Sequence, residues 1–255
     1  MMLKQLEARL SDLLRSAERG IPAPTAFLSP EERAEAEEYL MHQGARFAVY
    51  GGYEEAERTM ILLLPDYLES AYVNWDDYFV PVAILVSGYV GLSHRSFLGA
   101  LTALGIDRSA MGDILLLPFG AVVFVAPAIA AFLLTRPSPL ERVGADKVEV
   151  RDADGYPAMR SAIATYQRTY EPFTDVVASA RLDCAVSAFS RVSREKAKAL
   201  ILSGQVFHNH RQASRPDAAF GVSDVISVRG VGKFMIVSLK TTQKERIRIE
   251  AKRYV

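Results

Sequence analysis

Cationic side chains are concentrated between Ser190 and Ile201, where the sequence reads SRVSREKAKALI and four of the twelve residues are lysine or arginine. Arg194 and Lys198 are one helical turn apart and border an apolar stripe, and Arg191 lies in the turn before the helix. Cations grouped near a helix N-terminus, whose dipole also favours an anion, suit the phosphates of a polyanion. The alternative is a solvated basic helix, and this stretch alone supports both interpretations.

The distribution of charge along the chain separates the two interpretations. The formal net charge of the 255 residues is zero, with 30 lysine and arginine residues and 30 aspartate and glutamate residues. From Arg181 to the end there are 15 basic and 6 acidic residues, a balance of +9, and residues 1–180 have a balance of −9. A basic module joined to an acidic body favours nucleic-acid binding by the module.

Two short helices are predicted on either side of Arg191. Apolar residues recur at helical spacing in both: Leu182, Ala185, Val186 and Phe189 in the first, and Ala197, Leu200 and Ile201 in the second. Ser193 can cap the second helix, and Gly204 follows it at a left-handed position that suits glycine. If these helices share a core with the strands that follow, five cations gather around one concave surface: Arg181, Arg191, Arg194, Lys198 and Arg211.

The end of the chain has the period-two pattern of a strand. Three apolar residues, Ile247, Ile249 and Ala251, alternate with three cations, Arg246, Arg248 and Lys252. This pattern predicts one buried face and one mostly cationic face.

An uncharged run from Ile114 to Leu134, ILLLPFGAVVFVAPAIAAFLL, is long enough to span a bilayer. Pro118, Gly120 and Pro127 divide it into two strand-sized pieces and a short buried helix. A membrane span is the less favoured interpretation, and we expect no membrane association. We also expect Ser29 to cap an N-terminal helix.

These elements predict an α+β protein. Residues 1–73 form a mainly helical N-terminal domain, and residues 74–156 have the order βαββαβ of a ferredoxin-like or RRM-like domain. Residues 157–178 are polar and are predicted to be a linker. Residues 179–255 form the basic module. A single cysteine, Cys184, indicates a reducing compartment.

The basic module resembles the alpha-L RNA-binding domain first known from small-subunit ribosomal protein four. The matching pieces are RLD, SRVSREKAKALILSGQVFHN and GVSDVISVRGVGKF. His210 departs from the pattern, because glycine is frequent there. The resemblance implies contact with structured RNA by shape and phosphate. By the motif match, Arg181 and Asp183 are the first residues expected to be critical for RNA contact. The full set of residues expected to bind RNA is Arg181, Asp183, Ser190, Arg191, Ser193, Arg194, Lys196, Lys198, Asn209, Arg211 and Lys233.

The middle of the chain has a second resemblance. GLSHRSFLGALTALGIDRSAMGDILL is similar to the signature of the YlmH family of bacterial RNA-binding proteins, which carry a C-terminal alpha-L domain. Ser96 departs, because an acidic residue is common there. The resemblance implies a cytoplasmic, non-enzymatic factor on the large ribosomal subunit with a stalled peptidyl-tRNA. It implies large-subunit rRNA and tRNA as partners and a part in quality control with alanine tailing.

An RNA-modifying enzyme of pseudouridine synthase type is the alternative function. RLD resembles the catalytic aspartate motif of those enzymes, but Asp183 lies inside the RNA-binding module, where it can start a helix and orient Arg181. Cys184 is expected to be a packing residue. His208 and His210 lack further ligands at metal spacing. We therefore expect no catalytic residue, metal or cofactor.

Overall fold

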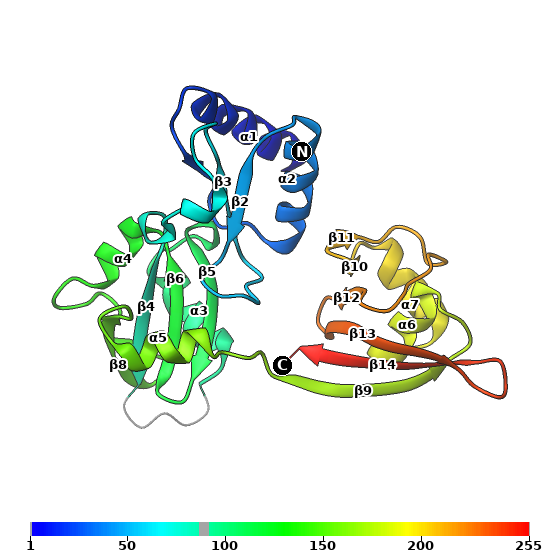
Figure 1. The fold of residues 1–255 in the computed structure, drawn as a ribbon. Helices are drawn as coiled ribbons and strands as arrows, with labels where there is room; N and C mark the ends of the chain where they lie inside the picture. Colours follow the sequence, from blue (N-terminus) through cyan, green and yellow to red (C-terminus); the bar gives the residue numbers. More distant parts are fainter. Residues whose placement is uncertain (1, 87–91, 255) are drawn as a thin grey trace. The chain divides into compact units, whose positions relative to one another are not determined.

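The computed structural model describes residues 2–86 and 92–254, and the chain divides into two compact units, Met1–Gln167 and Arg168–Val255 (Figure 1). Each unit has its own antiparallel sheets and its own hydrophobic core. Helices pack on sheets in both units, so the predicted α+β class is confirmed.

The beginning of the first unit combines two helices with a small sheet of order β1-β3-β2. Its elements are α1 (Met2–Glu18), β1 (Ala23–Pro24), α2 (Pro30–His42), β2 (Phe47–Tyr50), β3 (Met60–Leu63) and the 3-10 turns η1 (Ser70–Tyr72) and η2 (Trp75–Asp77). Ser29 caps α2 as predicted, because its Oγ accepts a hydrogen bond from the backbone of Glu32 and the Glu32 carboxylate accepts one in return. Leu10, Leu40 and Ile61 are buried where the helices meet the sheet.

The rest of the first unit contains a five-stranded sheet of order β5-β6-β4-β8-β7. Its elements are β4 (Val80–Val86), α3 (His94–Ala103), η3 (Arg108–Ala110), β5 (Met111–Leu117), β6 (Gly120–Val125), α4 (Pro127–Leu133), β7 (Arg142–Val143) and β8 (Asp146–Asp152). Apart from the short β7, this is the predicted βαββαβ order, with each helix joining two parallel strands that have another strand between them.

Both faces of this sheet are covered. Val82 and Val123 face α3 and α4, whereas Ala83 and Phe124, one position away on the same strands, belong to a second core. That second core includes Phe27 from the N-terminal segment and the helix α5 (Pro157–Ala164). The sheet face opposite α3 and α4, on which RRM-like domains stack bases, is therefore filled by protein.

The interval 157–178, predicted to be a linker, contains regular structure. Met159 and Ile163 lie on one face of α5 and are buried against the sheet. The strand β9 (Tyr170–Val177) follows and pairs with the last strand of the chain. Neither element is predicted from the sequence, because only one side of each contacts a core and the composition of the interval is therefore polar. The domain boundary predicted between residues 73 and 74 stays a prediction.

The apolar run from Ile114 to Leu134 forms β5, β6 and α4, as Pro118, Gly120 and Pro127 predicted. Among the helices that the structure describes, none combines the length and the apolar character needed to cross a membrane.

The YlmH-like signature joins the N-terminal segment to the sheet. The Asp113 carboxylate accepts hydrogen bonds from Tyr53 Oη at 2.7 Å and from the backbone N–H groups of Glu57 and Arg58 at 2.7 and 3.2 Å. Arg58 in turn donates to three backbone carbonyl groups, those of Phe27, Arg108 and Met111. A residue of the signature thus positions a loop more than fifty residues away.

Gly112 lets Phe27 approach β5. A Cβ atom at position 112 would lie 2.7 Å from Phe27 Cε1, and this ring is packed against Phe79. We expect Gly112→Ala to destabilise the first unit by about 1–3 kcal/mol through overpacking. Urea unfolding followed by the fluorescence of Trp75, the one tryptophan, measures this. Gly99→Ala, in an exposed helical position with open space around Cβ, is the matched control and is expected to be neutral or stabilising. Equal midpoints for the two variants would contradict the prediction.

The second unit packs two helices on one face of a six-stranded sheet of order β11-β10-β12-β13-β14-β9 (Figure 1). Its remaining elements are α6 (Leu182–Ser190), α7 (Arg194–Leu202), β10 (Val206–His208), β11 (Arg211–Gln212), β12 (Val225–Val228), β13 (Gly232–Thr241) and β14 (Ile247–Tyr254). Phe189 of α6 stacks on Phe234 of β13, with ring centroids 4.1 Å apart. The predicted alternation in β14 is confirmed, because Ile249 and Ala251 are buried and Arg248 is exposed.

Candidate nucleic-acid interface

Asp183 is the centre of an Arg–Asp–Arg cluster at the start of α6. Its side chain is fully buried, whereas those of Arg181 and Arg194 are 41% and 46% exposed. Arg181 Nε and Nη2 donate to the two carboxylate oxygens at 3.2 and 3.3 Å. Arg194 Nε and Nη2 donate to the same oxygens at 3.0 and 3.4 Å. The carboxylate thus joins the start of α6 to the start of α7 and holds both guanidinium groups at the surface.

The electrostatics of this cluster keep it charged. Burial alone raises the pKa of Asp183, but hydrogen bonds from Arg181 and Arg194, with their positive charges, outweigh burial and lower that pKa. The hydrogen bond to Asp183 raises the pKa of Arg194. With one carboxylate between two guanidinium groups, one positive charge is left for a ligand.

The turn between α6 and α7 brings a third cation to the same region. Arg191 ends α6 in the left-handed conformation, with φ of 52°, and Ser187 Oγ donates to the Val192 carbonyl at 2.6 Å. Arg191 and Arg194 both line a groove of about 310 Å³ between α6 and β9. Ser193 caps α7 as predicted, because its Oγ accepts a hydrogen bond from the Lys196 N–H.

The remaining predicted residues of the helix pair differ in accessibility. Lys196 is exposed in the first turn of α7. Lys198 is partly exposed, and its Nζ lies 3.0 Å from Glu195 Oε1. Ser190 Oγ is buried and has no hydrogen-bond partner within the described chain, so direct contact with a ligand would need a local rearrangement.

The β10–β11 hairpin explains the departure at His210. Asn209 and His210 both have positive φ, 48° and 65°, as a two-residue type I′ turn requires. Asp224 accepts hydrogen bonds from Asn209 Nδ2 at 2.7 Å and from the Gly221 N–H at 2.8 Å, and His208 Nε2 lies 2.8 Å away. Asn209 Oδ1 also accepts from the Val225 N–H. The structure therefore uses Asn209 to fix the turn that presents Arg211.

Lys233 lies apart from the other predicted residues of this set. Phe234 faces α6, so the alternation of β13 directs Lys233 to the opposite face of the sheet. There its Nζ lies 4.6 Å from the centroid of the Tyr254 ring. The structure thus groups the helix-pair residues Arg181, Asp183, Arg191 and Arg194 and places Lys233 on a second surface.

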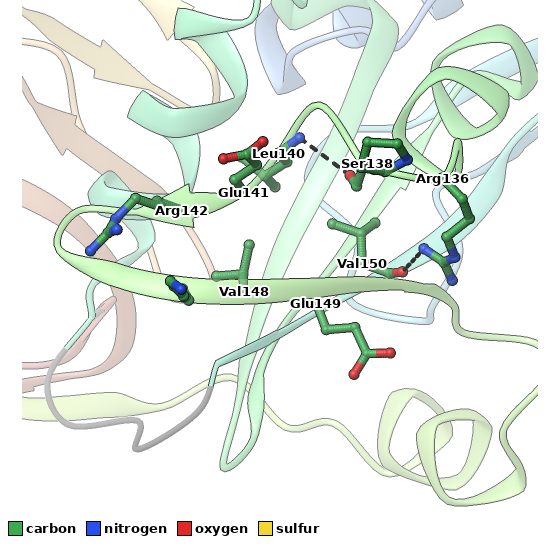
Figure 2. Close-up of a pocket in the computed structure, with 10 residues that line it drawn as sticks. Arg136, Ser138, Leu140, Glu141, Arg142, Val148, Glu149 and Val150 are labelled. Atoms are coloured by element: carbon green, nitrogen blue, oxygen red, sulfur yellow. Dashed lines mark hydrogen bonds between the residues drawn. The ribbon is translucent and has the colours of Figure 1, made fainter.

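A hollow in the first unit is lined by charges of both signs. It encloses about 360 Å³ beside β7 and β8, and its lining includes Arg136, Arg142 and Lys147 together with Glu141 and Glu149 (Figure 2). Arg136 Nη1 donates to the Val150 carbonyl at 2.9 Å, so this cation supports the loop. Within residues 2–86 and 92–254, no group of three His, Cys, Asp or Glu side chains is placed to hold a metal ion.

Comparisons with known proteins bear on both units. Residues 84–155 match the family described as "Putative RNA-binding domain in YlmH". Ribosome-associated protein quality control protein P2 of Bacillus subtilis (strain 168) is 27% identical over 232 residues, which cover 90% of this chain and 86% of that protein. A solved structure, cell division protein ylmH from Streptococcus pneumoniae, is 19% identical with a TM-score of 0.47, covering 61% of this chain and 94% of that one. The family match and the curated relative together confirm the likeness predicted from the sequence: residues 84–155 match the RNA-binding domain described for YlmH, and the chain is similar to the B. subtilis protein over most of its length.

Proposed function

We propose that this protein is a non-enzymatic RNA-binding factor that docks on the large ribosomal subunit through its second unit. The observation that carries the proposal is the Arg181–Asp183–Arg194 cluster, with Arg191 and Lys196 beside it at the start of α7. The name of the B. subtilis relative, a ribosome-associated quality control protein, supports the ribosome as the place of action.

The cluster suits phosphate binding because its arginines are fixed before a ligand arrives. Each guanidinium group has five N–H donors, and Asp183 accepts from only the Nε and Nη2 atoms of each. The remaining donors can contact phosphate oxygens, and less side-chain entropy is lost because the rotamers are already held. Such binding reads the shape and the backbone of structured RNA more than its sequence.

The partners of this surface are large-subunit rRNA and tRNA on a subunit that carries a stalled nascent chain. In this role the protein strengthens the hold on peptidyl-tRNA while alanine is added to the blocked chain. The chemistry of transfer belongs to the ribosome, and the protein contributes binding and positioning. Such a factor acts in the cytoplasm.

Cosedimentation tests this function. The full chain is mixed with purified large subunits, with or without bound peptidyl-tRNA, and centrifuged through sucrose at increasing salt. We expect cosedimentation at about 0.1 M salt, loss of most of it by about 0.5 M, and better retention with peptidyl-tRNA. Small subunits are the control. Equal retention on both subunits would refute docking on the large subunit, and retention that does not depend on salt would refute docking by phosphate contacts.

The pseudouridine synthase alternative is less compatible with the geometry. A catalytic aspartate must reach a base, but Asp183 has no exposed side-chain surface and is held by two arginines. A tritium-release assay on rRNA and tRNA measures the alternative directly, and turnover abolished by Asp183→Asn would favour it.

A further inference from the structure

We propose that the groove beside the β13–β14 hairpin is a second binding site for the sugar–phosphate backbone of RNA. This inference rests on the proposed function of the second unit and assigns to it a surface separate from α6 and α7. The groove encloses about 600 Å³, and four cations line it: Lys240, Lys244, Arg246 and Arg248.

The groove lies on the sheet face away from the helices. Lys240 of β13 pairs with Arg248 of β14, which pairs with Val176 of β9, so the three residues form a row across the sheet. Their neighbours Ile249 and Val177 point the other way, into the core that contains α6. The cations of this groove therefore lie on the face opposite α6 and α7, and the groove meets the one that Arg191 and Arg194 line at Val176 of the edge strand β9.

The charges in the groove are incompletely compensated within the protein. Lys240 and Arg248 stand directly opposite each other, an arrangement that destabilises a strand pair. Glu250, on the same face, lies 3.3 Å from Lys240 Nζ. None of the described residues that line the groove is acidic, although Glu245 lies in the adjoining turn. An anionic ligand would relieve the repulsion between the cations.

The cations are presented by a turn that is closed by hydrogen bonds. The Thr242 N–H donates to the Arg246 carbonyl at 2.7 Å, and the Glu245 N–H donates to the Thr242 carbonyl at 3.0 Å. Thr242 Oγ1 also accepts from the Arg246 N–H at 3.2 Å. These bonds close the loop that carries Lys244 and Arg246, so less order has to be gained on binding.

The shape of the surface favours an extended polyanion over a single ion. Beyond Glu250, the same face of β14 carries Lys252, whose Nζ lies 5.2 Å from the centroid of the Tyr170 ring. Lys252 lies four positions along the strand from Arg248, a span of about 13 Å that exceeds one phosphate group. Val176 is exposed on the floor and offers apolar contact to a ribose. The backbone of RNA offers both, because its phosphate groups repeat along the chain and riboses lie between them.

Charge reversal in the full chain tests the groove. Arg246→Glu/Arg248→Glu is compared with wild type for binding to purified large-subunit rRNA at several salt concentrations. We expect about tenfold weaker binding at about 0.1 M salt. The slope of log K against log salt concentration should also become shallower by about 1.5. Lys244→Glu is a milder second variant with an expected loss of about threefold. Arg9→Glu/Arg19→Glu, the same charge change on two exposed residues in and just after α1, is the control and should bind within twofold of wild type.

The outcomes separate this proposal from the function on which it rests. If wild type itself does not bind rRNA, the proposed function fails. If Arg191→Asn/Lys196→Glu, at the start of α7, abolishes binding while both hairpin variants bind like the control, the groove proposal fails and the function stands. Polyglutamate is also tested as a competitor of rRNA binding. If it competes as well as unlabelled rRNA at equal charge, and if this competition is lost in the hairpin variants, the groove takes acidic protein and the assignment to RNA is wrong.

Discussion

Replacing both Arg181 and Arg194 by methionine is expected to destabilise the second unit by about 3 kcal/mol or more. Methionine keeps the aliphatic cover over Asp183 but removes both hydrogen-bonding partners, which leaves a fully buried carboxylate uncompensated. Asp183→Asn in the same background removes the charge and is expected to restore most of the loss. Urea unfolding followed by circular dichroism measures both units, while Trp75 fluorescence reports the first unit alone and should not change.

The pH dependence gives the same prediction a second readout. In wild type the pKa of Asp183 is lowered, so its contribution to stability is present above the unfolded pKa of about 4 and is lost as the pH falls through the folded pKa. Without the arginines, burial raises this pKa instead, so the double variant should gain stability as the pH falls toward that pKa. If the stability of the double variant falls with acid as steeply as that of wild type, the two arginines do not compensate the buried charge of Asp183.

Local signals in the sequence were sufficient for the helix pair. The spacing of Leu182 and Phe189, the cap at Ser193 and the glycine at Gly204 all act within a few residues, and each has the predicted role. The salt bridge between Arg194 and Asp183 depends on how the two helices pack. The sequence could indicate that Asp183 orients Arg181, two residues away, but not that it also binds a residue on the next helix.

The elements that were missed depend on distant partners. In β9 only Val177 is buried, and Phe173 is partly so, because the strand lies at the edge of the sheet and pairs with β14 some seventy residues later. Its sequence, YEPFTDVV, therefore reads as polar and irregular. The position of Lys233 shows the same limit: the alternation of β13 is visible in GKFMIVSL, but which face the helices cover is settled only by tertiary packing.

Arg191→Asn/Lys196→Glu is expected to weaken binding of the full chain to large-subunit rRNA by about 100-fold at about 0.1 M salt. Both substitutions suit the backbone. Asn tolerates the left-handed conformation that Arg191 adopts. Glu at position 196 is the third residue of α7, where it can complete a capping box with Ser193 and interact favourably with the helix dipole. Stability should therefore be unchanged or slightly higher.

This combination of retained stability and lost binding is what a purely structural role cannot produce. If the start of α7 only held the fold together, a variant that keeps the fold would keep RNA binding. Arg9→Gln/Arg19→Glu applies the same change in net charge to two exposed residues in and just after α1, and it controls for the overall field of the protein. If the α7 variant and this control lose affinity equally, the effect is one of net charge, and the start of α7 is not the contact surface.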